Sequence, residues 1–373
     1  MPGYEADPRF RKLAADVKAI HQDLHNIELF HLGATVDGNE LRVLRRWNSH
    51  TPMLQFSYGG GYLLRWQDKG TVIDPGVTFL DVFQRPHPVE GLKRPHHMDD
   101  IDLVVVTHDH ADHCEDLGML LVFLRNYNKQ RGTYGLAAHK IDFVQSIGAH
   151  FRSVILLDNA ENRAFVRAIQ VPPPRRKPAS YEPLDLRAHY HMKIEEFCAD
   201  HTEVLGDRSA LGFRMKLYGG EDVAFVYCDT GDTGYNPELT KEYRDADLLL
   251  LHVGTMEGQG EHLCFSGVVE ILKDLEQHRR PKLVLLGEWG EEFRGPGYRK
   301  RFTELAKSVA GYTGPVLPAD LGMRIQLDDR CRVWCPAGKD GEWAAPQDVV
   351  VADWGQWIEY HAPQAMNTTP APN

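Results

Sequence analysis

Hydrophobic and polar residues follow the periods of both helices and strands along the chain, which predicts a mixed α/β protein. Between residues 8 and 24, apolar side chains recur every three to four positions, as on one face of an amphipathic helix. Short apolar runs rich in valine and leucine instead predict buried strands. Strands are predicted within 52–75, 102–106, 223–227, 247–253 and 282–286, and helices over much of 115–129 and over 267–278.

The same pattern predicts one large domain, residues 28–360, because no long linker interrupts it. The predicted helix near the N-terminus makes residues 1–27 a helical extension of that domain. The last residues, 361–373, have the composition of a disordered tail. A proline-rich, basic stretch at 171–180 is predicted to be an exposed loop or arm.

The composition narrows the classes of function. The chain has 373 residues, 42% of them hydrophobic, and a net charge of −11, which disfavours long nucleic acid because such a partner requires a basic surface. Six scattered cysteines, a charged start without a signal sequence and the lack of a long apolar run predict a reduced, cytoplasmic protein with no membrane contact. Nineteen histidines favour metal chemistry, although His96 and His97 lie in a predicted loop and are interpreted as surface residues.

The segment THDHADHC, residues 107–114, is the strongest candidate for a functional site. It directly follows a predicted buried strand and contains His108, His110, Asp112 and His113. Alternate residues of an extended segment point the same way, so the first two histidines can face one metal ion, and a turn after them would direct the next two ligands toward a second. Imidazole nitrogens and carboxylate oxygens are ligands of Zn²⁺. A solvated surface loop is the alternative, but it has no reason to follow a buried strand with this spacing.

Further metal ligands are expected from distant parts of the chain. Asp74, His201, Asp229 and Glu288 each lie at or just after a predicted strand. In α/β folds, ligand sites form at the carboxyl ends of strands. These four residues are therefore candidates to complete the site, although an aspartate before Pro-Gly, as at Asp74, is also typical of an ordinary turn.

The order of these residues, Asp, HxHxDH, His and Asp, resembles the metallo-β-lactamase superfamily over residues 28–325. Within that superfamily, the chain is most similar to the tRNase Z branch and to small-nucleotide phosphodiesterases. Three further stretches carry the resemblance: VYCDTG, with Cys228 in place of a glycine of the family's Gly-Asp-Thr; DADLLLLHVGT; and EHLCF, with Cys264 in place of a threonine. The resemblance implies an αββα sandwich, in which two mixed β-sheets are flanked by helices.

The resemblance also implies a role for each candidate residue. The first metal ion would be bound by His108, His110 and His201, the second by Asp112 and His113, and Asp229 would bridge the two. Asp74 would orient a ligand histidine through a hydrogen bond. Asp112 and His262 are the implied catalytic residues, and His262 matches the family histidine that handles the leaving-group proton.

Two positions depart from the family's pattern. Glu288 stands where the family has a histidine that completes the second metal site, unless the match shifts by one residue to Gly287. A glutamate ligand would keep the site and move its preference from Zn²⁺ toward Mn²⁺ or Fe²⁺. Val253 stands where the family has a glutamate that supports the proton-transfer histidine, so that histidine would lack its partner unless Glu257 or Glu261 replaces it.

The expected function is hydrolysis that depends on two divalent metal ions, with Zn²⁺ favoured and Mn²⁺ or Fe²⁺ as alternatives. Two metal ions close together would lower the pKa of a bridging water and create a hydroxide that attacks the substrate. A phosphodiester suits this chemistry, and the acidic chain favours a small nucleotide over a long RNA. A homodimer is expected because relatives often form one. Hydrolysis of a lactone, ester or amide and a metal-binding sensor without catalysis are the alternatives.

Overall fold

The computed structural model describes residues 7–30, 38–47, 58–84, 96–133, 135–171, 182–202, 209–258, 260–290, 293, 298–319, 321–334 and 357–358. The chain forms two compact units, Met1–Asp37 and Gly38–Asn373. In the first unit, α1 (Pro8–Phe30) begins where the hydrophobic pattern predicts and continues past residue 24. The loop prediction for residues 172–180 and the tail prediction for 361–373 lie outside the described residues.

Nine of the described strands form the first sheet, in the order β18-β17-β16-β1-β4-β5-β6-β7-β8. Their bounds are β1 (Glu40–Val43), β4 (Tyr62–Trp66), β5 (Lys69–Ile73), β6 (Leu103–Val106), β7 (Ile141–Gln145), β8 (Val166–Gln170), β16 (Arg324–Gln326), β17 (Val333–Trp334) and β18 (Trp357–Ile358). The strands from β5 to β8 pair in parallel and the others antiparallel. The sheet is therefore mixed.

Seven described strands form the second sheet, in the order β15-β14-β13-β12-β11-β10-β9. Their bounds are β9 (Leu184–Asp185), β10 (Met192–Cys198), β11 (Leu211–Gly219), β12 (Asp222–Asp229), β13 (Leu248–His252), β14 (Leu283–Gly287) and β15 (Val316–Pro318). The strands from β12 to β15 pair in parallel and the rest antiparallel. A short hairpin-like pair, β2 (Arg46–Trp47) and β3 (Tyr58–Gly59), lies outside both sheets.

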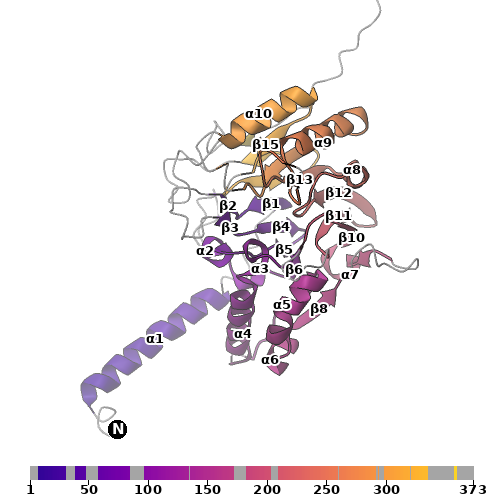
Figure 1. Cartoon of the computed structure of the whole chain (residues 1–373). Coiled ribbons are helices and arrows are strands. Elements are labelled where there is room, and N and C mark those ends of the chain that lie inside the picture. The colour runs from indigo at the N-terminus through magenta and orange to yellow at the C-terminus, as the bar shows by residue number, and fades with distance from the viewer. Residues whose placement is uncertain are drawn as a thin grey trace, which may run out of the picture. The chain divides into compact units, whose positions relative to one another are not determined.

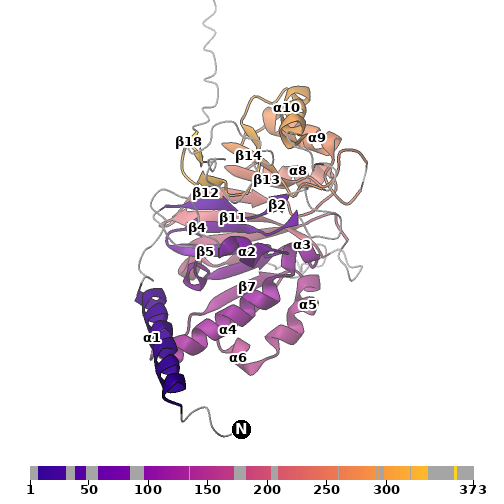
Figure 2. The same cartoon turned by 90° about the vertical axis from the view of Figure 1, so that its left-hand side faces the viewer.

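Helices cover the outer faces of the two sheets. Their bounds are α2 (Phe79–Phe83), α3 (Ala111–Cys114), α4 (Leu117–Thr133), α5 (Ile147–Leu157), α6 (Ala160–Arg163), α7 (Arg187–Tyr190), α8 (Pro237–Tyr243), α9 (Phe265–Gln277) and α10 (Tyr298–Ala310). Figures 1 and 2 show α4, α5 and α6 beside the first sheet and α8, α9 and α10 beside the second. Parallel strands require crossover connections, and these helices supply them. The predicted αββα sandwich of two mixed sheets is confirmed.

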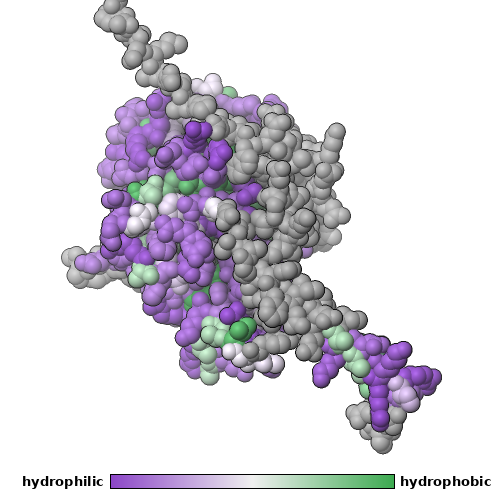
Figure 3. Space-filling view, turned by 180° about the vertical axis from the view of Figure 1, so that it is seen from behind, coloured by the Kyte–Doolittle hydropathy of each residue, from purple (hydrophilic) through white to green (hydrophobic). Residues whose placement is uncertain are grey.

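The apolar runs that predicted strands form the core between the layers. All positions of β6, β13 and β14 are buried, as expected for strands covered on both faces. Among the described residues on the face in Figure 3, hydrophilic side chains predominate, with small apolar areas between them. Within the described residues, no helix combines the length and the apolar character that crossing a membrane requires.

His96, interpreted as a surface residue, is buried instead. Its ring stacks on Phe83 at a centroid distance of 5.1 Å, and its Nε2 lies 3.0 Å from Nη1 of Arg42. Because a guanidinium can only donate, Nε2 of His96 must accept, and the ring is neutral. Burial lowers the pKa of His96 to about 4, and the positive charge of Arg42 acts in the same direction because it repels a protonated ring. His97 accepts a hydrogen bond from the Asp99 backbone and caps a short 3-10 helix.

Acidification is therefore expected to destabilise the fold through His96. The unfolded chain binds a proton at this histidine with the ordinary pKa of 6.5, whereas the folded chain does so only near pH 4. Between these values the unfolded state holds more protons, so the free energy of unfolding decreases as the pH falls, by at most about 3 kcal/mol. Urea unfolding at pH 7, 6 and 5 measures the slope. His96→Gln keeps an acceptor for Arg42 and cannot titrate, so an unchanged slope in this variant would contradict the assignment.

Candidate metal centre

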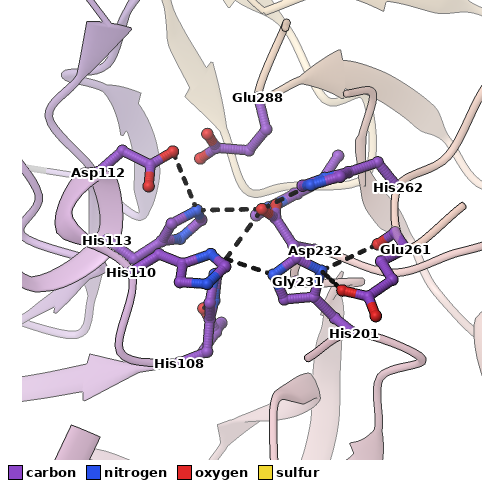
Figure 4. Close-up of polar contacts among 12 residues, drawn as sticks. His108, His110, Asp112, His113, His201, Gly231, Asp232, Glu261, His262 and Glu288 are labelled. Atoms are coloured by element: carbon purple, nitrogen blue, oxygen red, sulfur yellow. Dashed lines mark hydrogen bonds and ion pairs between the residues drawn. The ribbon is translucent and has the colours of Figure 1, made fainter. Parts of the chain in front are cut away.

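The loop after β6 and the first turn of α3 present His108, His110, Asp112 and His113 to one space (Figure 4). His110 is the N-cap residue of α3 and has extended backbone, so the chain changes there from strand to helix. Gly76 allows this turn to pack tightly, because a β-carbon on it would lie 1.6 Å from the carbonyl oxygen of Asp112. The turn expected after the two alternating histidines is therefore present as α3.

Asp74, just after β5, fixes the orientation of two histidines. Its carboxylate accepts hydrogen bonds from the backbone nitrogen and the hydroxyl of Thr107, both at 2.7 Å, and from Nδ1 of His113 at 2.8 Å. Because the Thr107 hydroxyl donates to Asp74, its oxygen accepts from Nδ1 of His108, 3.0 Å away. Both histidines therefore direct Nε2 into the space that they share.

One group of potential ligands combines residues from both sheets. Ligand atoms of His108, His110, His201 and Asp232 lie within 4.8 Å of one another. His201 follows β10 and donates from Nδ1 to the carbonyl oxygen of Glu261 at 3.0 Å, so its Nε2 faces Nδ1 of His110 at 3.1 Å (Figure 4). We call His108, His110, His201 and Asp232 the first ligand group.

The first ligand group fits a divalent metal ion. Three imidazole nitrogens and one carboxylate oxygen form a donor set typical of zinc. Nε2 of His108 is buried without a hydrogen-bond partner among the described residues, and such an atom is costly unless a cation binds it. Burial also lowers the pKa of His108 and of His201, which keeps both rings neutral and able to coordinate.

Asp112, His113 and Glu288 form a second group, with ligand atoms within 4.8 Å of one another. Glu288 follows β14 directly, with a left-handed backbone at φ +53°. Its carboxylate forms an ion pair with Nε of Arg45 and accepts a hydrogen bond from the Tyr62 hydroxyl at 3.4 Å. We call Asp112, His113 and Glu288 the second ligand group.

Comparison with known proteins identifies the family. The sequence model of the beta-lactamase superfamily domain matches residues 71–285, more than half of the chain. The chain belongs to the metallo-β-lactamase superfamily. No curated protein sequence matches the chain significantly.

Solved structures of metallo-β-lactamase fold proteins resemble the chain along most of its length. The metallo-β-lactamase fold protein YhfI from Bacillus subtilis superposes with a TM-score of 0.56 at 18% identity, and the match covers 77% of this chain and 99% of that one. The short form of human tRNase Z has a TM-score of 0.51 at 16% identity, covering 77% and 99%. A long form RNase Z from yeast has a TM-score of 0.54 at 16% identity, covering 79% and 42%. Likeness at these identities establishes the fold alone.

Asp229, which the resemblance implied as the bridging ligand, belongs to neither ligand group of this metallo-β-lactamase domain. It is the last residue of β12 and is fully buried. Its carboxylate accepts hydrogen bonds from the Tyr227 hydroxyl at 2.8 Å and the Gly231 backbone nitrogen at 3.0 Å, and it pairs with Nε2 of His252 at 2.9 Å. Asp229 therefore supports the site through His252, which contacts Asp232.

Asp232 takes the position that was predicted for Asp229. Its Oδ2 lies 3.7 Å from Nε2 of His108, within the first ligand group, and 3.5 Å from Nε2 of His113, which belongs to the second. The chain has two Asp-Thr pairs three residues apart, and only the second follows the glycine of the superfamily's Gly-Asp-Thr. That residue, Gly231, has φ +58° and turns the chain after β12. An unmodified match to Gly-Asp-Thr, at residues 231–233, is therefore the sequence feature that distinguishes the two aspartates.

His252, the last residue of β13, is a candidate functional residue that the sequence analysis missed. Its Nε2 lies 2.9 Å from Oδ1 of Asp229, and its Nδ1 lies 3.0 Å from Oδ1 of Asp232. Burial lowers the pKa of His252, but the surrounding carboxylates, Asp229 foremost, outweigh burial and raise it to about 10. The charged ring holds Oδ1 of Asp232 and leaves Oδ2 toward the ligand histidines. The sequence feature that could have indicated His252 is its position directly after a run of four leucines, at the end of a predicted strand.

His262 lies beside the first ligand group. Its Nδ1 is 3.5 Å from Oδ2 of Asp232, and its ring centroid is 4.8 Å from that of His201 (Figure 4). Val253, where the superfamily pattern has a glutamate, is buried and forms a parallel bridge with Leu263, which fixes the backbone next to His262. The His262 side chain is 38% exposed, so a substrate can reach it.

A pocket of about 430 Å³ opens at His262. Its lining residues include Asp200, Tyr235, Glu261, His262, Cys264 and Ser266. Glu261, one of the two glutamates considered as a partner for His262, accepts hydrogen bonds from the backbone and the hydroxyl of Thr202. The pocket thus has a polar wall close to the first ligand group, which suits a small ligand with oxygen atoms.

Proposed function

We propose that the protein is a metal-dependent hydrolase and that it cleaves a phosphodiester bond in a small nucleotide. The observation that carries the proposal is the first ligand group, a buried set of three histidines and Asp232, with His262 beside it at the pocket. His108, His110, His201 and Asp232 would hold a divalent metal ion, which would supply Lewis acidity for activating water and for polarising the phosphoryl group. Zn²⁺ is favoured by the nitrogen-rich donor set, and Mn²⁺ and Fe²⁺ are alternatives.

The chain's own residues contribute orientation and proton transfer. Asp74, Glu261 and His252 hold the ligand side chains in one orientation through the hydrogen bonds and ion pairs described above. Nδ1 of His262 faces Asp232, which leaves Nε2 to protonate the departing alkoxide at the pocket.

Three points support the proposal, the first for a phosphodiester bond and the other two for a small substrate. Two structural neighbours, from human and from yeast, are named ribonucleases of the Z type. The net charge of −11 opposes the binding of a long polyanion. A pocket of about 430 Å³ is within the range of small-molecule sites. A homodimer remains a prediction from the resemblance.

Turnover of bis-p-nitrophenyl phosphate by the full chain, with Zn²⁺ or Mn²⁺, is the first test. We expect diester hydrolysis that His110→Ala abolishes together with metal binding. His278→Ala, at the exposed C-cap of α9, is the matched control and should retain both. Cyclic mono- and dinucleotides and a tRNA precursor then define the substrate.

Two results would contradict the proposal. Bound metal with cleavage of esters, amides or lactones but no diester would indicate a different hydrolase of the same fold. Bound metal with no turnover of any of these substrates would indicate a metal-binding sensor.

A further inference from the structure

We infer that the guanidinium of Arg45 takes the place of a second metal ion, so that the chain binds one divalent ion, at the first ligand group. Arg45 follows β1, which is held between β4 and β16 in the first sheet. Its side chain is fully buried, at 2% exposure. The inference rests on the proposed function for the metal at the first ligand group and assigns a different occupant to the second.

The guanidinium of Arg45 contacts every member of the second ligand group. Its Nη2 lies 3.0 Å from Oδ2 of Asp112 and 3.5 Å from Nε2 of His113, and its Nε pairs with the carboxylate of Glu288. Nη1 also donates to the carbonyl oxygen of Asp112 at 2.7 Å. The planar fork of an arginine suits this arrangement, since it donates several hydrogen bonds in fixed directions. The two carboxylates that would coordinate a metal ion already pair with a cation.

Charge balance favours the same conclusion. Arginine does not lose its proton in proteins, so Arg45 is a permanent positive charge beside two carboxylates. A divalent ion among the same three ligands would lie against that charge in a buried site, where repulsion between cations is weakly screened. The ion could bind only if the contacts of Arg45 with Asp112 and Glu288 were broken, which would leave a buried guanidinium without its partners.

This arrangement explains why position 288 is a glutamate. The resemblance implied a histidine there, and a neutral imidazole would leave Arg45 with one carboxylate fewer. Glu288 supplies the negative charge that a buried guanidinium needs, and Tyr62 donates to the same carboxylate. Arg45 and Glu288 are therefore one unit. This unit keeps Asp112 and His113 in place beside Asp232 without a second metal ion.

Metal content of the full-length, untagged protein tests the inference. Samples are loaded with Zn²⁺ or Mn²⁺, desalted and analysed by mass spectrometry for metal per chain, and titration calorimetry gives the affinities. We expect one equivalent for the wild type and for Arg45→Lys, which keeps the charge. Arg45→Gln should bind a second equivalent. Arg42→Gln, a buried arginine that pairs with Glu40 and contacts His96, is the matched control and should bind one.

A second variant covers the case in which Arg45→Gln does not fold, as judged by circular dichroism. The double variant Arg45→Gln/Glu288→His removes the buried ion pair and installs the histidine that the resemblance implied, so it should bind two equivalents. Two equivalents of similar affinity in the wild type, or one in both charge-removed variants, would overturn the inference. Two equivalents with diester turnover would leave the proposed function intact, whereas a wild type without any bound metal would remove both.

Discussion

Replacing Asp232 with alanine is expected to weaken metal binding at the first ligand group and to lower kcat/KM for a diester by roughly 10³-fold or more. Removing one hydrogen-bond donor that stabilises charge in a transition state already lowers kcat about 10²- to 10³-fold. Asp232 contributes the one carboxylate of the first ligand group, and its Oδ2 also lies 3.5 Å from His113. Without it, the ion would be left with three neutral imidazoles, a set that can hold Zn²⁺ but supplies no negative charge. Metal analysis and diester turnover measure the two effects separately.

Asp229→Asn is the matched comparison for Asp232→Ala. Its carboxylate faces Tyr227, Gly231 and His252, so its replacement weakens the support of the site and leaves the ligand set complete. We expect metal affinity to decrease about 10- to 100-fold, as for other residues that orient ligands. If Asp229→Asn lost all metal while Asp232→Ala retained it, Asp229 would be the ligand after all, and the assignment based on the structure would be wrong.

His262→Ala is expected to have the second largest effect, and the size of that effect should depend on the leaving group. For diesters with an ordinary alcohol as leaving group, loss of the proton donor should lower kcat about 10²- to 10⁴-fold. A p-nitrophenolate group departs without a proton, so bis-p-nitrophenyl phosphate should be affected far less. Metal content should stay the same, because His262 is not a member of either ligand group.

Comparison of the two substrates distinguishes proton transfer from a structural role. A structural role of His262 would lower turnover of both substrates equally and would change the metal content or the melting temperature. His278→Ala again controls for the loss of one histidine at the surface. An equal loss with both diesters would therefore contradict the role of His262 as the proton donor.

Much of the fold could be predicted because its strands are short apolar runs whose chemistry changes abruptly where they end. The runs at 102–106, 247–253 and 282–286 became β6, β13 and β14, each followed by polar residues at the site. The histidine segment was identifiable for the same reason. A cluster of ionisable side chains directly after a fully buried strand has no structural explanation without a ligand.

The parts of the site that were missed depend on contacts that no local pattern encodes. Asp229 is the last residue of β12 and Asp232 lies three residues beyond it, and only the position where β12 ends decides which carboxylate faces the histidines. Arg45 lies in a stretch without a motif, and its contact with Asp112 spans 67 positions of the sequence. Such a pairing follows from the placement of β1 in the middle of the first sheet, which the hydrophobic pattern alone does not determine.

The first ligand group combines His108 and His110, which follow a strand of the first sheet, with His201 and Asp232, which follow strands of the second. An ion held by all four would thus connect the two halves of the sandwich and close loops of the chain, in addition to the packing and the polar contacts, such as Arg45 with Glu288, that already join them. Because the unfolded chain cannot assemble this set, binding free energy is added to folding free energy, about 2.7 kcal/mol when the free ion is at 100 times its Kd. The metal supply of the environment in which the protein folds would therefore set part of the equilibrium stability of the sandwich, as well as the activity proposed for it.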